Sequence, residues 1–165
     1  MERSFPGTSL VAMAHFVTGL IANIETLEAF AHKHSLQPPM PLTQGLAILA
    51  LLDTDLDSFL TPPLTERPDG FNYLSRQLLE ELQGESREAS LMYFETEYFG
   101  GDGVQGAVVL VDGTATFGPA SAESGPINHA LALLGVTVVP PARDEFETIG
   151  LDRHRRTEDW LRSSP

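Results

Sequence analysis

The chain of 165 residues carries 10 Lys and Arg against 23 Asp and Glu, a formal net charge of −13, and it contains no Cys. This acidity excludes a typical nucleic-acid-binding protein, because phosphate contacts need clustered Lys and Arg, and it disfavours an anionic membrane surface. The absence of Cys excludes disulfides, thiolate metal sites and Cys nucleophiles. The hydrophobic share of 42% suffices for a packed core, and the length suits one domain.

The apolar stretch over residues 10–22 is too short to span a bilayer, which takes about 20 residues. It also makes a poor signal peptide, because only Arg3 supplies positive charge before it. We therefore expect a cytoplasmic protein without membrane contact. Met13 offers a second start of translation, so we expect residues 1–12 to be a disordered extension and residues 13–165 to form the domain.

The first predicted element is a buried strand over residues 14–22, which are apolar and rich in branched side chains. Asn23 follows as the N-cap of a helix that ends before the prolines at 38–41. The apolar run over residues 42–52 is a second buried strand or a short buried helix. Periodicity does not separate these alternatives, and we favour the strand.

One helical turn is expected at residues 56–60, followed by the clearest helix of the chain over residues 70–83. Asp69 serves as its expected N-cap and Gly84 as its stop. Its apolar side chains follow the spacing of a core-facing helix and are Phe71, Leu74, Leu78 and Leu82.

A three-strand antiparallel meander is predicted over residues 90–118. Residues 91–99 alternate as a strand, 100–103 predict a loop, and 104–111 predict the second strand. Asp112-Gly113 is a typical two-residue hairpin turn leading into the third strand.

The C-terminal part predicts short elements. Pro126 begins a helix that Gly135 closes, residues 136–139 suggest a last strand, and residues 144–149 and 157–160 suggest helical turns. The whole pattern predicts one α+β domain, with a mainly antiparallel sheet and about three helices packed on it.

Two motifs resemble ligand-binding loops without meeting their requirements. Residues 101–108 match G-x-G-x-x-G-x-V, but a strand rather than a helix follows, and the only lysine is Lys33. We therefore interpret the glycines as hairpin residues, with Gly106 marking a bulge. The acidic run at residues 53–57 lacks the later Gly and Glu of a calcium loop, so we expect no metal site.

Two regions concentrate polar side chains that can bind a ligand or a partner. Glu95 and Glu97 share one side of a strand and can share a proton, hold a hard cation or act as an acid and base pair. They can equally face solvent, or pair with arginines of the C-terminal segment. That segment combines both charge signs with the only Trp, and it either ties the C-terminus to the sheet or forms a recognition site. The candidate binding residues are Glu95, Glu97, Gln105, Asp144, Glu145, Arg153, His154, Arg155, Glu158, Asp159 and Trp160.

No residue is assigned a catalytic role. His32 and His34 point in different directions on their helix, and no zinc-protease or serine-hydrolase motif is present. His15 lies in the first strand and is expected to be an interior histidine.

The hairpin YFGGDGVQGA at residues 98–107 and the segments DEF (144–146), GLDRHR (150–155) and TEDW (157–160) carry a resemblance. Together they resemble a family of small, uncharacterised, acidic bacterial proteins with a YFGG-x-G-x-Q hairpin and a C-terminal DEF…GL-x-RHR-x-TEDW motif. The resemblance implies no established activity and transfers no catalytic residue. By size and charge alone, the chain is similar to the immunity proteins encoded beside bacterial toxins.

The sequence thus predicts a binding protein without catalytic activity or cofactor, whose partner is a basic, toxin-like protein. The alternative is a small enzyme or ligand sensor with a site between Glu95, Glu97 and residues 153–160. Self-association into a homodimer through the edge of the meander is a third prediction.

Overall fold

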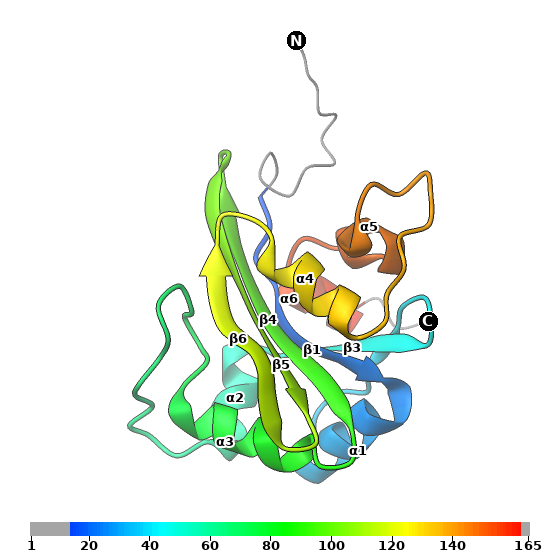
Figure 1. Ribbon diagram of the computed structural model, residues 1–165. Coiled ribbons are helices and arrows are strands. Elements are labelled where there is room, and N and C mark those ends of the chain that lie inside the picture. Colours follow the sequence, from blue (N-terminus) through cyan, green and yellow to red (C-terminus); the bar gives the residue numbers. More distant parts are fainter. Residues whose placement is uncertain (1–13, 163–165) are drawn as a thin grey trace.

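Six antiparallel strands form one sheet with the order β2-β3-β1-β4-β5-β6 (Figure 1). This computed structural model describes residues 14–162, so the extension expected at residues 1–12 lies outside the described residues. The strands are β1 (Thr18–Asn23), β2 (Met40–Pro41), β3 (Leu46–Ala50), β4 (Ser90–Phe99), β5 (Asp102–Val111) and β6 (Thr114–Ala122). The helices are α1 (Ile24–His34), α2 (Asp53–Phe59), α3 (Arg76–Glu85), α4 (Pro126–Leu133), α5 (Glu145–Ile149) and α6 (Thr157–Arg162), with a 3-10 turn at Leu151–Arg153.

The sheet separates two hydrophobic layers, because successive side chains of a strand point to opposite faces. On β4, Tyr93 belongs to the layer covered by α1, α2 and α3, whereas Phe94 belongs to the layer covered by α4, α5 and α6. Figure 1 shows the first three helices gathered below the sheet and the last three on its other side. The predicted α+β class, antiparallel sheet and meander are confirmed, but six helices rather than about three pack on the sheet in residues 14–162.

The first strand and helix follow the local sequence signals. The Asn23 side chain accepts a hydrogen bond from the Thr26 amide at 2.8 Å, so the predicted N-cap is confirmed. The run at 42–52 contains β3, which confirms the strand and not the helix. Both strands have a neighbour on each side. β1 pairs with β3 and β4, and β3 pairs with β1 and β2.

The helix expected at residues 70–83 begins later, at Arg76, and Asp69 is not its cap. Ser75 is the N-cap and accepts the Leu78 amide at 3.1 Å, and the helix continues through Gly84 to Glu85. The chain before Ser75 is a loop because the amides of Asn72 and Tyr73 bind the Glu95 carboxylate instead of helical carbonyls. Loop residues still fill the core, which is why their apolar spacing resembled a helix.

The strand expected at residues 136–139 is absent from the described structure. The Thr137 amide donates to the Gln44 side chain and the Val139 amide donates to the Thr148 hydroxyl. Side chains therefore satisfy the amides that a neighbouring strand would otherwise bind.

The β4–β5 hairpin turns at Gly100 and Gly101, whose φ angles are 63° and 89°. Its loop is therefore shorter than expected, and β5 begins at Asp102. Gly106 is needed for packing rather than for a bulge, because a Cβ there would lie 2.5 Å from the Phe71 ring. The register is irregular instead from Ala107 to Leu110, where β5 pairs with β6.

The two edge strands of the sheet, β2 and β6, are both poor templates for the addition of another strand. β2 is only two residues long, and β6 carries Pro119 and an irregular register, both of which weaken strand addition. None of the helices within residues 14–162 has the length and apolar character needed to cross a bilayer.

Candidate functional site

Polar side chains collect where β1 begins, at one end of an otherwise apolar sheet face. Thr18 is the first residue of β1 and pairs with Glu95 of β4, so both side chains lie on the face covered by α1–α3. Glu97 follows two residues later on the same face. Both Thr18 and Glu95 are buried, at 7% and 4% exposure.

Glu95 anchors the loop that precedes α3. Its carboxylate accepts hydrogen bonds from the Asn72 amide at 2.6 Å, the Tyr73 amide at 2.8 Å and the Tyr93 hydroxyl at 2.6 Å. Burial raises the pKa of Glu95 above its usual range, and these donors oppose the rise because they favour the charged form. The carboxylate is thus enclosed by its own chain, which favours a structural role over acid–base chemistry.

We expect Glu95→Ala to lower the free energy of unfolding by about 2–4 kcal/mol, because two amides and a hydroxyl lose their buried acceptor. Urea denaturation followed by circular dichroism measures the change. Glu97→Ala is the matched control on the same strand face, and it should shift stability by no more than about 0.5 kcal/mol because Glu97 is exposed. Equal effects of the two substitutions would contradict the anchoring role.

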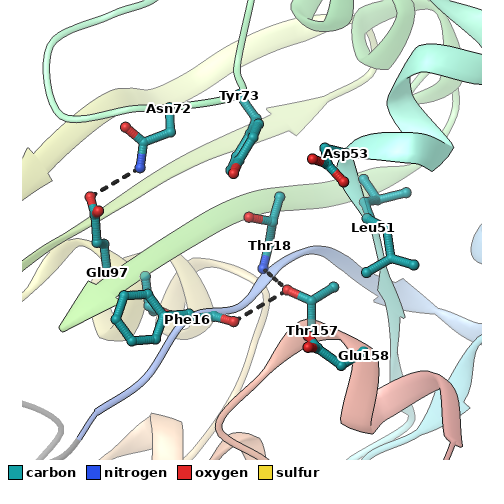
Figure 2. Close-up of a pocket in the computed structure, with 11 residues that line it drawn as sticks. Phe16, Thr18, Leu51, Asp53, Asn72, Tyr73, Glu97, Thr157 and Glu158 are labelled. Atoms are coloured by element: carbon teal, nitrogen blue, oxygen red, sulfur yellow. Dashed lines mark hydrogen bonds between the residues drawn. The ribbon is translucent and has the colours of Figure 1, made fainter. Parts of the chain in front are cut away.

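A cavity of about 240 Å³ opens beside this anchor (Figure 2). Thr18 of β1 lies at its centre, Glu97 and Asn72 border one side, and Asp53 at the start of α2 borders the other. Tyr73 lies above it, and the beginning of α6 lies below. Its other lining residues are Phe16, Leu51, Leu52, Thr96, Thr157 and Glu158.

The cavity is strongly acidic. Three lining residues carry carboxylates, namely Asp53, Glu97 and Glu158, and among residues 14–162 no Lys, Arg or His lines the cavity. The pKa of the Tyr73 hydroxyl is raised by burial first and then by the charges of Asp53, Glu95 and Glu97. Two carboxylates of the cavity wall, Asp53 and Glu97, therefore act on the Tyr73 hydroxyl together with the enclosed Glu95.

The C-terminal segment reaches this cavity because it is tied to the start of β1. The Phe16 amide donates to the Arg155 carbonyl at 2.7 Å, and the Thr157 amide donates to the Phe16 carbonyl at 3.0 Å. The Thr157 hydroxyl adds a bond to the Phe16 carbonyl and accepts the Thr18 amide. Main-chain pairing and one Thr side chain thus fix the position of α6, which carries Glu158 to the cavity.

His15 packs beneath the junction between the C-terminal segment and the start of β1. It is 1% exposed, its Nδ1 lies 2.7 Å from the Thr96 hydroxyl, and its ring packs edge-on against Phe146. The expectation of an interior histidine is confirmed.

Several candidate residues in the C-terminal segment hold local structure. Asp144 caps α5 by accepting the Glu147 amide, and it also accepts from the Asn128 side chain. Glu145 lies in the first turn of α5, as Glu158 and Asp159 do in α6. Negative charges in the first turn of a helix interact favourably with the helix dipole.

Trp160 is 1% exposed and belongs to the hydrophobic layer covered by α4–α6. The guanidinium of Arg153 lies 5.4 Å from its ring centroid and donates to the Pro41 and Gly150 carbonyls. The His154 ring meets Trp160 edge-on at 4.7 Å. This cluster is on the opposite sheet face from Glu95, so Trp160 packs in the core rather than presenting its ring to a partner.

The pairing of Glu95 and Glu97 with C-terminal arginines, one of the alternatives that the sequence leaves open, is not found among the described residues. Among residues 14–162, no ion pair joins either carboxylate to Arg153, Arg155 or Arg156. Glu95 is occupied by the loop before α3, and Arg153 by main-chain carbonyls. Of the candidate residues, the structure brings together Glu97 and Glu158 at the cavity.

Gln105 also has a structural position. Its Oε1 accepts the Ile127 amide at 2.7 Å at the start of α4, and its Nε2 donates to the Tyr98 hydroxyl at 3.1 Å. Because Gly125 offers no capping side chain, Gln105 supplies one from the neighbouring strand.

Sequence reasoning missed most of the cavity residues. Thr18 lies inside an apolar run, and the helix predicted over residues 70–83 includes Asn72 and Tyr73, although α3 begins only at Arg76. The sequence around Asp53 indicates only an acidic turn. The available signal was a hydroxyl residue within a buried strand, which requires a polar neighbour.

Within residues 14–162, no group of three or more His, Asp or Glu side chains is arranged to hold a metal ion. Comparison of the chain with known protein families, curated proteins and solved structures finds no match.

Proposed function

We propose that this protein is a non-catalytic binding protein for a positively charged protein partner. The observation that carries the proposal is the acidic cavity, whose lining within residues 14–162 includes three carboxylates and no basic side chain. The net charge of −13 supports it, because a negative surface speeds encounter with a basic partner and repels acidic ones.

The narrower form of the proposal is a cytoplasmic, immunity-like protein that neutralises a basic toxin. The support is the small size of the domain, its acidity and the enclosure of Glu95, which removes one candidate catalytic acid from an open site. Toxins that act on nucleic acid are often basic, since they must contact phosphates.

The test is to produce the protein with each product of the genes that flank its own and to measure binding by calorimetry. We expect a basic product to bind, with affinity falling as NaCl rises from about 50 mM to about 500 mM because added ions screen the attraction. If no flanking product binds, or if binding is unaffected by salt, the proposal is overturned.

The second candidate is a small enzyme or ligand sensor. The observation favouring it is that Glu97 and Glu158 line one cavity together with the hydroxyl residues Thr18 and Tyr73. Turnover of a small molecule that Glu97→Gln and Glu158→Gln both abolish would favour this candidate over the binding protein.

A further inference from the structure

The C-terminal segment of residues 154–162 is attached to the sheet through a short stretch of main chain. The Phe16 amide donates to the Arg155 carbonyl at 2.7 Å, and the Thr157 amide donates to the Phe16 carbonyl at 3.0 Å. Phe16 and Arg156 form an isolated parallel bridge outside the named strands, rather than part of a continuous ladder. An attachment of this length can open locally while the strands of the sheet remain paired.

His15 directly precedes this attachment, and its ring is buried beneath the segment. Its exposed fraction is 1%, and the ring packs edge-on against Phe146 of α5 at a centroid distance of 5.4 Å. Nδ1 lies 2.7 Å from the Thr96 hydroxyl, whereas Nε2 is buried and has no hydrogen-bond partner within residues 14–162. A titratable side chain is thus enclosed where the segment meets the sheet, with one ring nitrogen unsatisfied.

This environment favours the neutral ring of His15 over the protonated one, because a protonated imidazole donates from both nitrogens. The Thr96 hydroxyl can accept from Nδ1. The Nε2 proton would stay buried with no acceptor at hydrogen-bond distance among residues 14–162, which costs free energy. Burial accordingly lowers the pKa of His15 from 6.5 to about 4. The nearby carbonyls of Leu151 and His154 raise this pKa and oppose the effect of burial only in part.

The charged groups around His15 do not compensate a proton on its ring. Among residues 14–162, no carboxylate forms an ion pair with His15. The charge of Arg155 disfavours the protonated ring, and Glu147 of α5 is paired with Arg143 at 3.0 Å. The other titratable groups on β4, α5, the 3-10 turn and the C-terminal segment around this layer are Tyr98, Glu145, Asp152, His154, Glu158 and Asp159. A proton on His15 is therefore best accommodated by water, which reaches the ring when the segment moves away.

We infer that His15 and residues 154–162 form an acid-operated latch, in which a proton on His15 releases the segment while the six-stranded sheet stays folded. The proton binds more favourably to the open form, where the ring reaches water, so acid increases the population of that form. Opening also carries Thr157 and Glu158 away from the acidic cavity. The latch is a property of the chain alone and does not depend on the proposed partner.

The expected size of the effect follows from the two pKa values of His15. An open segment gives the ring its ordinary pKa of 6.5, against a pKa of about 4 in the closed protein. From about pH 7 to about pH 5, the ratio of open to closed protein should therefore rise about twentyfold. Amide hydrogen exchange of the full-length protein, followed by NMR, measures this ratio, because the amides of Phe16 and Thr157 are hydrogen-bonded across the latch.

After correction for the intrinsic exchange rate, the amides of Phe16 and Thr157 should be less protected than those in the centre of β4 and β5. Their protection should fall about twentyfold from about pH 7 to about pH 5. Equal protection of the latch and the sheet centre at each pH would overturn the inference, since the segment would then open only when the whole domain unfolds. Protection of the latch amides that does not change with pH would overturn it as well.

His15→Asn removes the titrating group and keeps an amide that can reach Thr96, so the protection of Thr157 in this variant should not change with pH. His32→Asn is the matched control, because His32 is exposed on α1 at the opposite face of the sheet, and the pH dependence should remain. A pH dependence that survives in His15→Asn would remove His15 as the trigger. The unsubstituted protein gives a measurement that needs no variant, since NMR titration of the His15 ring should have a midpoint at about pH 4. A midpoint near 6.5 in the folded protein would overturn the latch.

Discussion

Replacement of Trp160 by Ala is expected to lower the free energy of unfolding by about 3–5 kcal/mol. Trp160 is 1% exposed and fills the layer between the sheet and α4–α6. The substitution removes this packing and also the surface on which Arg153 and His154 rest. Urea denaturation followed by circular dichroism measures the loss, since Trp160 is the only Trp and its fluorescence disappears with it.

Leu133→Ala is the matched control, because Leu133 is 52% exposed on α4 of the same layer. It should change stability by no more than about 0.5 kcal/mol. A Trp160→Ala protein that is as stable as this control would contradict the buried position and return Trp160 to the surface as a binding residue.

The protein is expected to lose about 3 kcal/mol of stability between pH 6.5 and pH 4 through His15 alone. Burial lowers the pKa of His15 from 6.5 to about 4. Between these values the unfolded chain binds a proton that the folded protein does not, so stability is present above pH 6.5 and falls as the pH decreases. Chemical denaturation at intervals from pH 4 to pH 7.5 measures this dependence.

Some groups around His15 raise its pKa and others lower it. The charge of Arg155 also disfavours the protonated ring, whereas the nearby carbonyls of Leu151 and His154 favour it. Nε2 has no hydrogen-bond partner within residues 14–162, so these carbonyls only partly compensate for burial. Protonation should loosen the C-terminal segment first, because His15 lies between it and the sheet.

His15→Asn is the variant that isolates this effect, because its amide can reach Thr96 but does not titrate. The raised pKa of Glu95 acts in the opposite direction, since stability falls as the pH rises through its titration. Glu95 remains in both proteins, so the difference between their pH profiles reports His15. Parallel profiles for the two proteins would show that His15 does not remain neutral in the fold.

The two largest expected effects both concern residues that join the C-terminal segment to the sheet. This junction also places Thr157 and Glu158 at the acidic cavity. Variants that loosen the junction should therefore weaken partner binding indirectly, whereas Glu97→Gln acts at the cavity itself. Measurement of stability alongside binding separates the two causes.

The sequence by itself determined the elements whose signals are local. The Asn23 cap depends on a side chain three residues from its donor, and the Asp112-Gly113 turn depends on φ angles of 50° and 83° that these residue types tolerate. The alternation over β4 depends on a period of two within one strand. Each signal is complete within a few residues, so it survives any tertiary arrangement.

Only the tertiary structure decided the limits of α3 and the composition of the site. Residues 70–74 have apolar spacing typical of a helix, but Glu95 binds their amides from more than 20 positions along the chain, which excludes a helix there. In the same way, the cavity combines Thr18, Glu97 and Glu158, which lie far apart in sequence. The physical reason is that hydrogen bonds and charges act over a few ångströms in space, and chain folding alone determines which distant residues come within that range.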